Sequence, residues 1–342
     1  MIETENSQKI SGKMLCANLH GVNDLRIEKV EIPMCGDDEV LVKIKRCGIC
    51  GSDIGRVFYD GTYHFPTIPG HEFSGEVVFD KTGVMTGKRV AVFPLLPCFE
   101  CEMCKNEKYV LCRDYDYYGS RRNGGYAEYI AVKRFNVVEL PDNITYEEGA
   151  MCEPASVARN AASRLGIKKG DTVLISGAGT IGLIAAQWAI AFGASKIMFV
   201  ETDNDKLKFC EKMGYEKYTE DKKIDAAIEG PGAGDALTTI INAVKPFGTV
   251  VLMGNPPKDM VLGKKVYQSI LRKELSLKGI WNSRYSLLEN DWLESVKAMS
   301  EGRINVKPLI SHIFGLSECK SALELMKDKK EFYCKVMIDN EK

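Results

Sequence analysis

Four cysteines lie close together in the sequence, at positions suited to a single metal ion. Cys98, Cys101, Cys104 and Cys112 are separated by two, two and seven residues. Thiolates bind Zn²⁺ in a tetrahedron, and two-residue loops let neighbouring sulfur atoms converge on one ion. An iron–sulfur cluster also uses four cysteines, but the ferredoxin pattern continues with Cys-Pro after three further residues, which this sequence lacks. The spacing therefore predicts a structural zinc site that does no chemistry, because all four ligands come from the protein.

A second set of residues with metal-ligating side chains is spread along the chain. Cys50 begins a Cys-Gly-Ser-Asp segment, and His71 stands within Gly-His-Glu. A third candidate ligand is Glu153 or its neighbour Cys152. A catalytic zinc has three protein ligands, drawn from Cys, His and carboxylate, and keeps one position for water or substrate. A single Cys or His is more often structural, so these residues indicate a metal site only as a set.

A glycine pattern near the middle of the chain indicates a dinucleotide site. Gly177, Gly179 and Gly182 form Gly-x-Gly-x-x-Gly, and Ile181 precedes the last glycine. The motif follows a predicted strand and opens a predicted helix, which is the context that it requires. The glycines permit a tight turn, approach of the backbone to a pyrophosphate, and close packing of the helix on the strand. The helix N-terminus offers free N–H groups to the phosphates.

Glu201 lies 19 residues after Gly182, at the end of the next predicted strand. An acidic side chain at this point accepts hydrogen bonds from the ribose hydroxyls and repels a 2′-phosphate. Asp203 and Asp205 follow, and no arginine stands nearby in the sequence to bind that phosphate. The sequence therefore predicts NAD(H) rather than NADP(H) as the cofactor.

Two kinds of sequence must position these residues. Before about residue 134, short β-type runs are separated by Gly, Pro and Asp, which is typical of an irregular, mostly antiparallel domain. Strand and helix patterns then alternate at residues 172–176, 180–192 and 197–200, which is typical of a parallel sheet with crossover helices. Residues 333–338 form a last predicted strand, which we expect to return to the first domain.

Taken together, the motifs resemble those of a zinc-dependent medium-chain dehydrogenase/reductase, from about Met14 to the C-terminus. The Cys-Gly-Ser-Asp and Gly-His-Glu segments, the four-cysteine lobe, Glu153-Pro154 and the glycine motif occur in the order typical of that family. The resemblance implies an α/β protein with a GroES-like β-rich catalytic domain and a Rossmann doubly wound parallel-sheet domain. We expect the catalytic domain with its structural zinc lobe at 1–156, the NAD-binding domain at 157–298, and a return to the catalytic domain at 299–342.

The resemblance also implies the third ligand of a catalytic zinc. Alcohol dehydrogenases of the family use a second cysteine, whereas its polyol dehydrogenases carry Glu-Pro at that point. We therefore expect Cys50, His71 and Glu153 as ligands, with Cys152 as a packed neighbour. Glu72 is expected to be a further ligand, directly or through water, or a group that tunes the metal. Two zinc ions per chain are expected, one catalytic and one structural.

Three further segments resemble the polyol-phosphate branch of the family, namely residues 94–98, 118–129 and 271–275. They imply a sugar alcohol phosphate, such as galactitol 1-phosphate, as the substrate. A phosphorylated substrate needs cationic donors near the reacting hydroxyl. Arg56, or Arg121 with Arg122, would supply them, although the latter two are equally compatible with a surface or interface role.

The expected reaction oxidises a secondary hydroxyl of the polyol, with hydride transfer to NAD⁺. Zinc would act as a Lewis acid that lowers the pKa of this hydroxyl, and Ser52 would pass its proton outward. The family often relays the proton through a histidine five residues after the first zinc cysteine, where this chain has Gly55. A dehydrogenase of sorbitol, L-iditol or threonine, and a non-catalytic redox- or metal-responsive binding protein, are the alternatives. The intact set of candidate ligands disfavours the last.

Composition restricts the class of partner. The 46 Lys+Arg and 47 Asp+Glu give a formal charge of −1, and 45% hydrophobic residues are typical of a globular protein with a sizeable core. This balance argues against a nucleic-acid ligand, and the longest nearly continuous apolar stretch, residues 181–194, is shorter than the roughly 20 residues needed to cross a membrane. Residues 1–13 show no signal pattern, so we expect a cytoplasmic enzyme with a small-molecule substrate. The family resemblance implies a homodimer or homotetramer.

Overall fold

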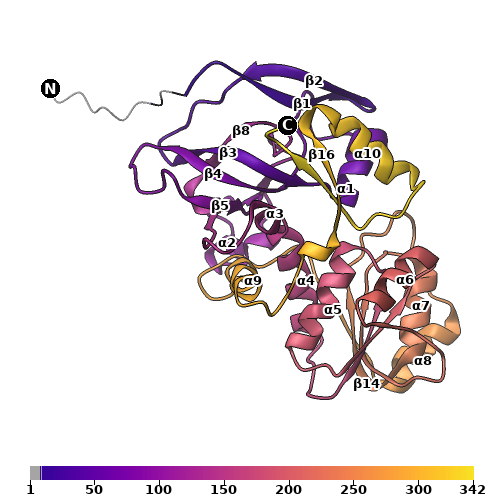
Figure 1. The fold of residues 1–342 in the computed structure, drawn as a ribbon. Helices are drawn as coiled ribbons and strands as arrows, with labels where there is room; N and C mark the ends of the chain where they lie inside the picture. Colours follow the sequence, from indigo (N-terminus) through magenta and orange to yellow (C-terminus); the bar gives the residue numbers. More distant parts are fainter. Residues whose placement is uncertain (1–7, 9) are drawn as a thin grey trace. The chain divides into compact units, whose positions relative to one another are not determined.

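The computed structural model describes residue 8 and residues 10–342, and the chain divides into two compact units (Figure 1). The first unit comprises Met1–Glu153, Tyr285–Ser300 and Val306–Lys342. The second comprises Pro154–Arg284 and Glu301–Asn305. None of the helices in the described residues is long and apolar enough to span a membrane.

A seven-stranded sheet forms the centre of the first unit. Its middle strand, β3, places Val40, Val42 and Ile44 at alternate positions, where all three are fully buried. Side chains two residues apart in a strand share one face, so these three contribute to the same hydrophobic core. The strands in spatial order are β16 (Ile310–Gly315), β17 (Lys335–Asp339), β3 (Glu39–Gly48), β4 (Glu72–Asp80), β5 (Arg89–Val92) and β9 (Val137–Glu139), and β8 (Tyr129–Lys133) also pairs with β3.

The C-terminal strand returns to this sheet, as the sequence predicts. β17 runs antiparallel to β3, with Met337 opposite Gly48 and Ile338 opposite Cys47. It runs parallel to β16, because α10 (Cys319–Asp328) makes the connection between them. This pairing brings the last residues of the chain beside the segments that carry Cys50 and His71.

Shorter elements complete the first unit. They are the hairpin of β1 (Lys13–Gly21) and β2 (Asp24–Glu31), the pair of β6 (Leu95–Leu96) and β7 (Asp116–Tyr117), and the helices α1 (Gly51–Gly55), α2 (Glu102–Lys105), α3 (Tyr146–Ala150) and α9 (Asp291–Ser300). A π-helical turn, Arg56–Asp60, follows α1 directly.

The segment Tyr285–Ser300 belongs to the first unit, whereas the sequence predicted that the chain returns to the catalytic domain only at residue 299. Aromatic packing accounts for this difference. The ring of Tyr285 stacks on Phe93 with 4.4 Å between centroids, and Trp292 meets Phe93 edge-on at 5.7 Å. Phe93 and Trp292 are almost completely buried, so removing α9 from this unit would expose a large apolar surface.

The second unit is built on a six-stranded, entirely parallel sheet, which confirms the predicted doubly wound domain. Val173, Leu174 and Ile175 in β10 are fully buried, as expected for a strand covered on both faces. The strand order is β12 (Glu216–Lys217), β11 (Lys196–Val200), β10 (Thr172–Ser176), β13 (Ile224–Glu229), β14 (Val244–Leu252) and β15 (Ser276–Gly279). The sequence order reverses between β10 and β13, which is where such sheets bind dinucleotides. The helices are α4 (Cys152–Arg164), α5 (Thr180–Ala191), α6 (Asn204–Lys212), α7 (Gly234–Ala243) and α8 (Lys264–Lys273), of which α4 begins two residues before the unit (Figure 1).

Candidate functional site

Three candidate metal ligands converge in the first unit. One potential ligand atom from each of Cys50, His71 and Glu72 lies within 4.8 Å of the others. Cys50 is the residue that precedes α1, and Glu72 begins β4, directly after His71. Glu72 is paired with Gly48 on the neighbouring strand, and a Cβ at Gly48 would collide with the Glu72 carboxylate. The glycine therefore leaves room for the carboxylate to lie across β3.

Asp53 is the buried carboxylate that organises this group. It accepts hydrogen bonds from the backbone N–H of Cys50 at 3.0 Å and from the Tyr126 hydroxyl at 2.9 Å. Its other oxygen lies 2.9 Å from Arg56 Nη1 and 3.4 Å from His71 Nδ1. Burial would raise the pKa of Asp53, but His71 and Arg56 outweigh it and lower the pKa. An ionised carboxylate in this position orients a ligating histidine.

His71 stands in a strongly negative environment. Burial lowers the pKa of His71, but Asp53 and Cys50 more than compensate and raise it well above its ordinary value. The buried Nδ1 atom faces Asp53 Oδ1 at 3.4 Å, without the geometry of a hydrogen bond. An imidazole nitrogen, a thiol and a carboxylate around one point are a donor set that suits zinc, so the residues fit the ion.

Glu72 is paired with a lysine from the far end of the chain. Lys335 Nζ lies 2.5 Å from Glu72 Oε2 and also donates to the Ile49 carbonyl at 3.1 Å. Both charged side chains are at most 4% exposed. Burial lowers the pKa of Lys335, but Glu72 and Cys50 outweigh this effect and raise it.

Glu153 is also buried, but it is not one of the three residues grouped within 4.8 Å. Burial is the largest effect on its carboxyl and, together with Glu72, raises the pKa of Glu153 to about 7, although His71 acts in the opposite direction. No lysine or arginine forms an ion pair with Glu153 within the described part of the chain. The neighbouring Cys152 is fully buried, and its thiol donates to the Glu148 carbonyl at 3.7 Å.

Ser52 and Arg56 lie at the exposed side of the group. Ser52 is exposed, and its hydroxyl accepts a hydrogen bond of 2.8 Å from Arg56 Nη1. The same nitrogen donates to Asp53, and the Arg56 side chain retains 23% exposure. Arginine is permanently protonated, so Arg56 cannot accept a proton from Ser52.

Arg121 and Arg122, unlike Arg56, form no hydrogen bond or ion pair with the described residues of the metal group. The Arg121 guanidinium lies between the rings of Tyr63 and Tyr115, 4.3 and 4.2 Å from their centroids. Arg122 forms an ion pair with Asp116. Both arginines line a cavity to which none of the residues grouped around Cys50 contributes.

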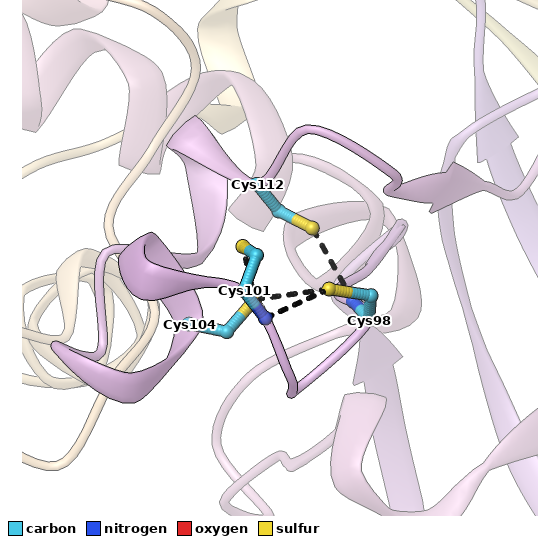
Figure 2. Close-up of side chains that lie close together, drawn as sticks. All are labelled: Cys98, Cys101, Cys104 and Cys112. Carbon is cyan, nitrogen blue, oxygen red and sulfur yellow. Dashed lines mark hydrogen bonds between the residues drawn. The ribbon is translucent and has the colours of Figure 1, made fainter.

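The four cysteines of the lobe form a compact cluster (Figure 2). Cys104 Sγ lies 3.5 Å from Cys101 Sγ and 3.9 Å from Cys98 Sγ. Four sulfur atoms about 2.3 Å from one tetrahedral zinc would be about 3.8 Å apart, so these separations fit the ion. The Cys98 N–H donates to Cys112 Sγ, and hydrogen bonding with the Cys104 backbone lowers the pKa of Cys101 to about 6. Cys98, Cys101, Cys104 and Cys112 form no disulfide bond.

The glycine motif forms a tight turn at the start of α5 in the second unit. Gly177 has φ of +88°, a conformation that favours glycine, and a Cβ at Gly182 would collide with the Gly177 carbonyl oxygen. Gly179 precedes the helix, and a Cβ built on it would meet no atom within 4 Å. The backbone is therefore open to a ligand at Gly179, and Ile181 lies half-buried in the first helical turn.

Glu201 connects the end of β11 to this turn. Its Oε2 accepts from the Ala178 N–H at 2.9 Å, and its Oε1 accepts from the Thr202 N–H at 2.7 Å and the Asp203 N–H at 3.0 Å. A carboxylate offers about four acceptor positions. One position at Oε2 remains for a further donor.

Comparisons with known proteins agree with these sites. Residues 36–142 match the model of an alcohol dehydrogenase GroES-like domain, and residues 180–301 match that of a zinc-binding dehydrogenase. The chain is 35% identical over 315 residues to galactitol 1-phosphate 5-dehydrogenase of Escherichia coli strain K12, which covers 85% of this chain and 91% of the relative. This protein belongs to the zinc-dependent medium-chain dehydrogenase/reductase family.

Two further comparisons show that this dehydrogenase is similar to other members of the family in sequence and in structure. Sorbitol dehydrogenase of Bombyx mori is 34% identical over 338 residues, covering 91% of this chain and 94% of the relative. The crystal structure of galactitol-1-phosphate dehydrogenase from Escherichia coli matches with a TM-score of 0.86 and 32% identity, covering 96% of this chain and all of that one. The predicted GroES-like and Rossmann organisation is confirmed, and the chain is an oxidoreductase of the nicotinamide-dependent type.

Sequence reasoning gave no role to two residues at the metal group of this dehydrogenase. Asp53 stands in the quoted Cys-Gly-Ser-Asp segment, and its place at the third position of a short helix was a usable signal, because an acid there can accept from the preceding backbone N–H groups. Lys335 had no such signal. It lies 263 residues from Glu72 and reaches it only through the pairing of β17 with β3.

Proposed function

We propose that this dehydrogenase oxidises a secondary hydroxyl of a sugar alcohol phosphate, such as galactitol 1-phosphate, to the keto sugar phosphate with NAD⁺ as hydride acceptor. Arg56 is the observation that carries the proposal. Its hydrogen bonds to the described residues all come from Nη1, so Nε and Nη2 are available to a ligand. A guanidinium binds phosphate oxygens in a bidentate manner. Sequence identity alone does not identify the substrate, because this chain is 35% identical to the galactitol 1-phosphate 5-dehydrogenase and 34% identical to the sorbitol dehydrogenase.

We infer that Cys50, His71 and Glu153 hold the catalytic zinc, while Cys98, Cys101, Cys104 and Cys112 hold a structural zinc. Glu72 lies within the group, but Lys335 already balances its charge. The buried Glu153 carboxyl forms no ion pair with a lysine or arginine of the described residues, and the charges of His71 and Lys335 do not outweigh its burial, so a bound cation would be needed to keep it ionised. Zinc bound there supplies Lewis-acid chemistry, which lowers the pKa of the substrate hydroxyl.

Ser52 is proposed to carry the proton away from the reacting hydroxyl. Its oxygen already accepts from Arg56, so one lone pair and its own proton remain for a second partner. Gly55 has no side chain and Arg56 is already protonated, so neither can accept a proton from Ser52. Ser52 is exposed, and the proton therefore passes from it directly to water. Asp53 holds His71 and the Cys50 backbone in place while this happens.

NAD(H) is proposed as the cofactor, bound at Gly177, Gly179, Ile181 and Gly182. The open approach to Gly179 and the position of this residue at the N-terminus of α5 support binding of the pyrophosphate. The remaining acceptor position on Glu201 supports a hydrogen bond from a ribose hydroxyl. Its negative charge disfavours the 2′-phosphate of NADP.

A reducing, cytoplasmic location belongs to the same proposal. It is supported by the cluster of Cys98, Cys101, Cys104 and Cys112, which form no disulfide bond, because clustered thiols of this kind would be oxidised in a secretory compartment. A homodimer or homotetramer also remains a proposal.

The substrate proposal is tested by kinetics of the zinc-loaded enzyme with NAD⁺. We expect a kcat/KM for galactitol 1-phosphate at least about a hundredfold above those for galactitol and sorbitol, because two charge-assisted hydrogen bonds contribute about 3 kcal/mol. Arg56→Gln should remove most of this preference, and the exposed control Arg303→Gln should keep it. Equal values for phosphorylated and free polyols would overturn the proposal in favour of a polyol dehydrogenase.

A further inference from the structure

We propose that the first unit carries a second ligand site, apart from the metal group, which binds a small hydroxylated organic anion. The site is the cavity between β1, β2, β8 and the segments around residues 64–68 and 118–124. It encloses about 580 Å³, which is within the range of pockets for small metabolites. None of Cys50, Ser52, Arg56 or His71 lines it.

The cavity is lined by both apolar and polar side chains. Met14, Ile68 and Ile130 are buried side chains that line one part, where a carbon skeleton can pack. Asn18 and Arg121 line the same cavity and contribute polar side chains to it. This combination is typical of sites that bind one small molecule in a fixed orientation.

Arg121 provides a rigidly held donor that lacks a partner. Its Nη1 donates to the Tyr115 carbonyl at 2.7 Å and its Nη2 to the Tyr63 hydroxyl at 3.2 Å. The two flanking tyrosine rings fix the plane of the guanidinium. The buried Nε has no hydrogen-bond partner. A buried N–H without an acceptor is costly, so this position requires an oxygen acceptor from a ligand or from water.

Asn18 provides a buried acceptor atom without a hydrogen-bond donor among the described residues. Its Nδ2 donates to Glu28 Oε1 at 2.7 Å, which fixes the orientation of the amide. The residue is 7% exposed, and its Oδ1 is buried without a partner. This oxygen can only accept, so the group opposite it must be a donor such as a hydroxyl. Two residues that line one cavity therefore lack, among the described residues, an acceptor for Arg121 Nε and a donor for Asn18 Oδ1.

The charges of the lining residues favour an anion as the acceptor. No carboxylate among the described residues forms an ion pair with Arg121, whereas the charge of Arg122 is balanced by Asp116. Glu31 is the carboxylate that lines the cavity, and it is exposed, so solvent screens it and it can accept from a ligand hydroxyl. A phosphate ester of a polyol and a hydroxy acid both combine an anionic oxygen with hydroxyls, and both fit this chemistry.

The test is calorimetric titration of the zinc-loaded full chain, without NAD⁺, with four probes: sn-glycerol 3-phosphate, D-glycerate, inorganic phosphate and glycerol. We expect saturable binding of one or both hydroxylated anions, and the tighter of the two identifies the anionic group. Glycerol, which lacks the charge, and inorganic phosphate, which lacks the carbon-bound hydroxyls, should bind at least about tenfold more weakly, because each loses a hydrogen bond worth about 1 to 2 kcal/mol.

Two variants locate the binding. Ala131 lines the cavity from β8, so Ala131→Phe fills it while keeping every charge, and Arg121→Gln removes the orphan donor. Each should weaken binding at least about tenfold. The exposed control Arg26→Gln should have no effect, and circular dichroism melting should show that all variants are folded.

Three results would overturn the inference. They are the absence of saturable binding by both hydroxylated anions, equally tight binding of inorganic phosphate, and binding that persists unchanged in both Ala131→Phe and Arg121→Gln. The variant Arg56→Gln separates this site from the proposed substrate site. Binding in the cavity should survive that substitution, even if Arg56 proves unimportant for turnover.

Discussion

Lys335 Nζ lies 2.5 Å from Glu72 Oε2, and the two side chains are 4% and 2% exposed. One partner comes from the start of β4 and the other from the last strand of the chain. A charge buried to this degree is tolerated only with a partner, so the C-terminal strand takes part in the electrostatics of the metal group. The charge balance of the metal group therefore depends on the correct pairing of β17 in the sheet.

Replacing Lys335 with methionine should destabilise the first unit by about 3–5 kcal/mol, because the Glu72 carboxylate is left buried without a cation. Urea unfolding at pH 7 measures this. The double variant Lys335→Met/Glu72→Gln should recover a large part of the loss, because it removes both charges. Lys245→Met, which breaks a more exposed pair with Asp225, should cost less than about 1 kcal/mol. A double variant no more stable than Lys335→Met would contradict this account.

Cys50→Ser and His71→Ala should abolish turnover while NADH binding persists, because the glycine turn belongs to the other unit. Steady-state rates, NADH fluorescence titration and zinc analysis together check the prediction, with loss of one zinc per chain expected. Cys35→Ser removes a partly buried thiol elsewhere and serves as the control. Full activity in a His71→Ala sample shown to lack that zinc would refute the metal role.

Cys101→Ser should remove the structural zinc and lower the melting temperature, while the rate at low temperature is retained. The four thiols lie in a lobe whose local chain has little regular structure, so the metal is expected to contribute several kcal/mol to its folding. Each kcal/mol lost corresponds to about 2–4 °C for a domain of this size. A zinc content unchanged from the wild type would show that the cluster does not bind the ion.

Glu201→Gln should raise the ratio of kcat/KM for NADP⁺ to that for NAD⁺ by about tenfold or more, because it removes the charge that repels a 2′-phosphate. Glutamine retains one acceptor oxygen for the backbone N–H groups of the turn, so the loop is less disturbed than in Glu201→Ala. The control Asp235→Asn changes an exposed carboxylate at the start of α7. An unchanged ratio in both Glu201 variants would discredit the ribose contact.

Asp80 should contribute to stability in a pH-dependent way. Its carboxylate accepts from Arg134 Nη2 at 2.7 Å and from the Met85 N–H at 2.8 Å. The hydrogen bond from Arg134 is the largest cause of the lowered pKa of Asp80. A carboxyl with a lowered pKa in the folded state stabilises the fold fully above its unfolded pKa of about 3.9, and this contribution is lost as the pH falls below that value.

Asp80→Asn should therefore cost about 1–3 kcal/mol at pH 7 and measurably less at pH 3, where the unfolded carboxyl is protonated but the folded one is still ionised. Urea unfolding at the two pH values measures the difference. Asp142→Asn, at an exposed position, should give the same small change at both. A cost for Asp80→Asn that does not shrink at low pH would exclude the carboxylate as its source.

The sequence alone determined the parts of this protein that rest on local spacing. Four cysteines within fifteen residues, three glycines after an apolar run, and alternating strand and helix patterns each depend on neighbours in the chain. Such patterns survive without knowledge of the fold, so the two kinds of domain and the parallel sheet followed from them.

Only the tertiary structure decided which distant residues meet. The contact of Lys335 with Glu72, the shared use of Asp53 by His71 and Arg56, and the place of α9 in the first unit all depend on strand pairing and aromatic packing between segments far apart in sequence. The structure also separated Arg56 from Arg121, which the sequence treated as equivalent cations. Charge and residue type are readable from a sequence, but the burial and the partners that set their free energy arise only when the chain is packed.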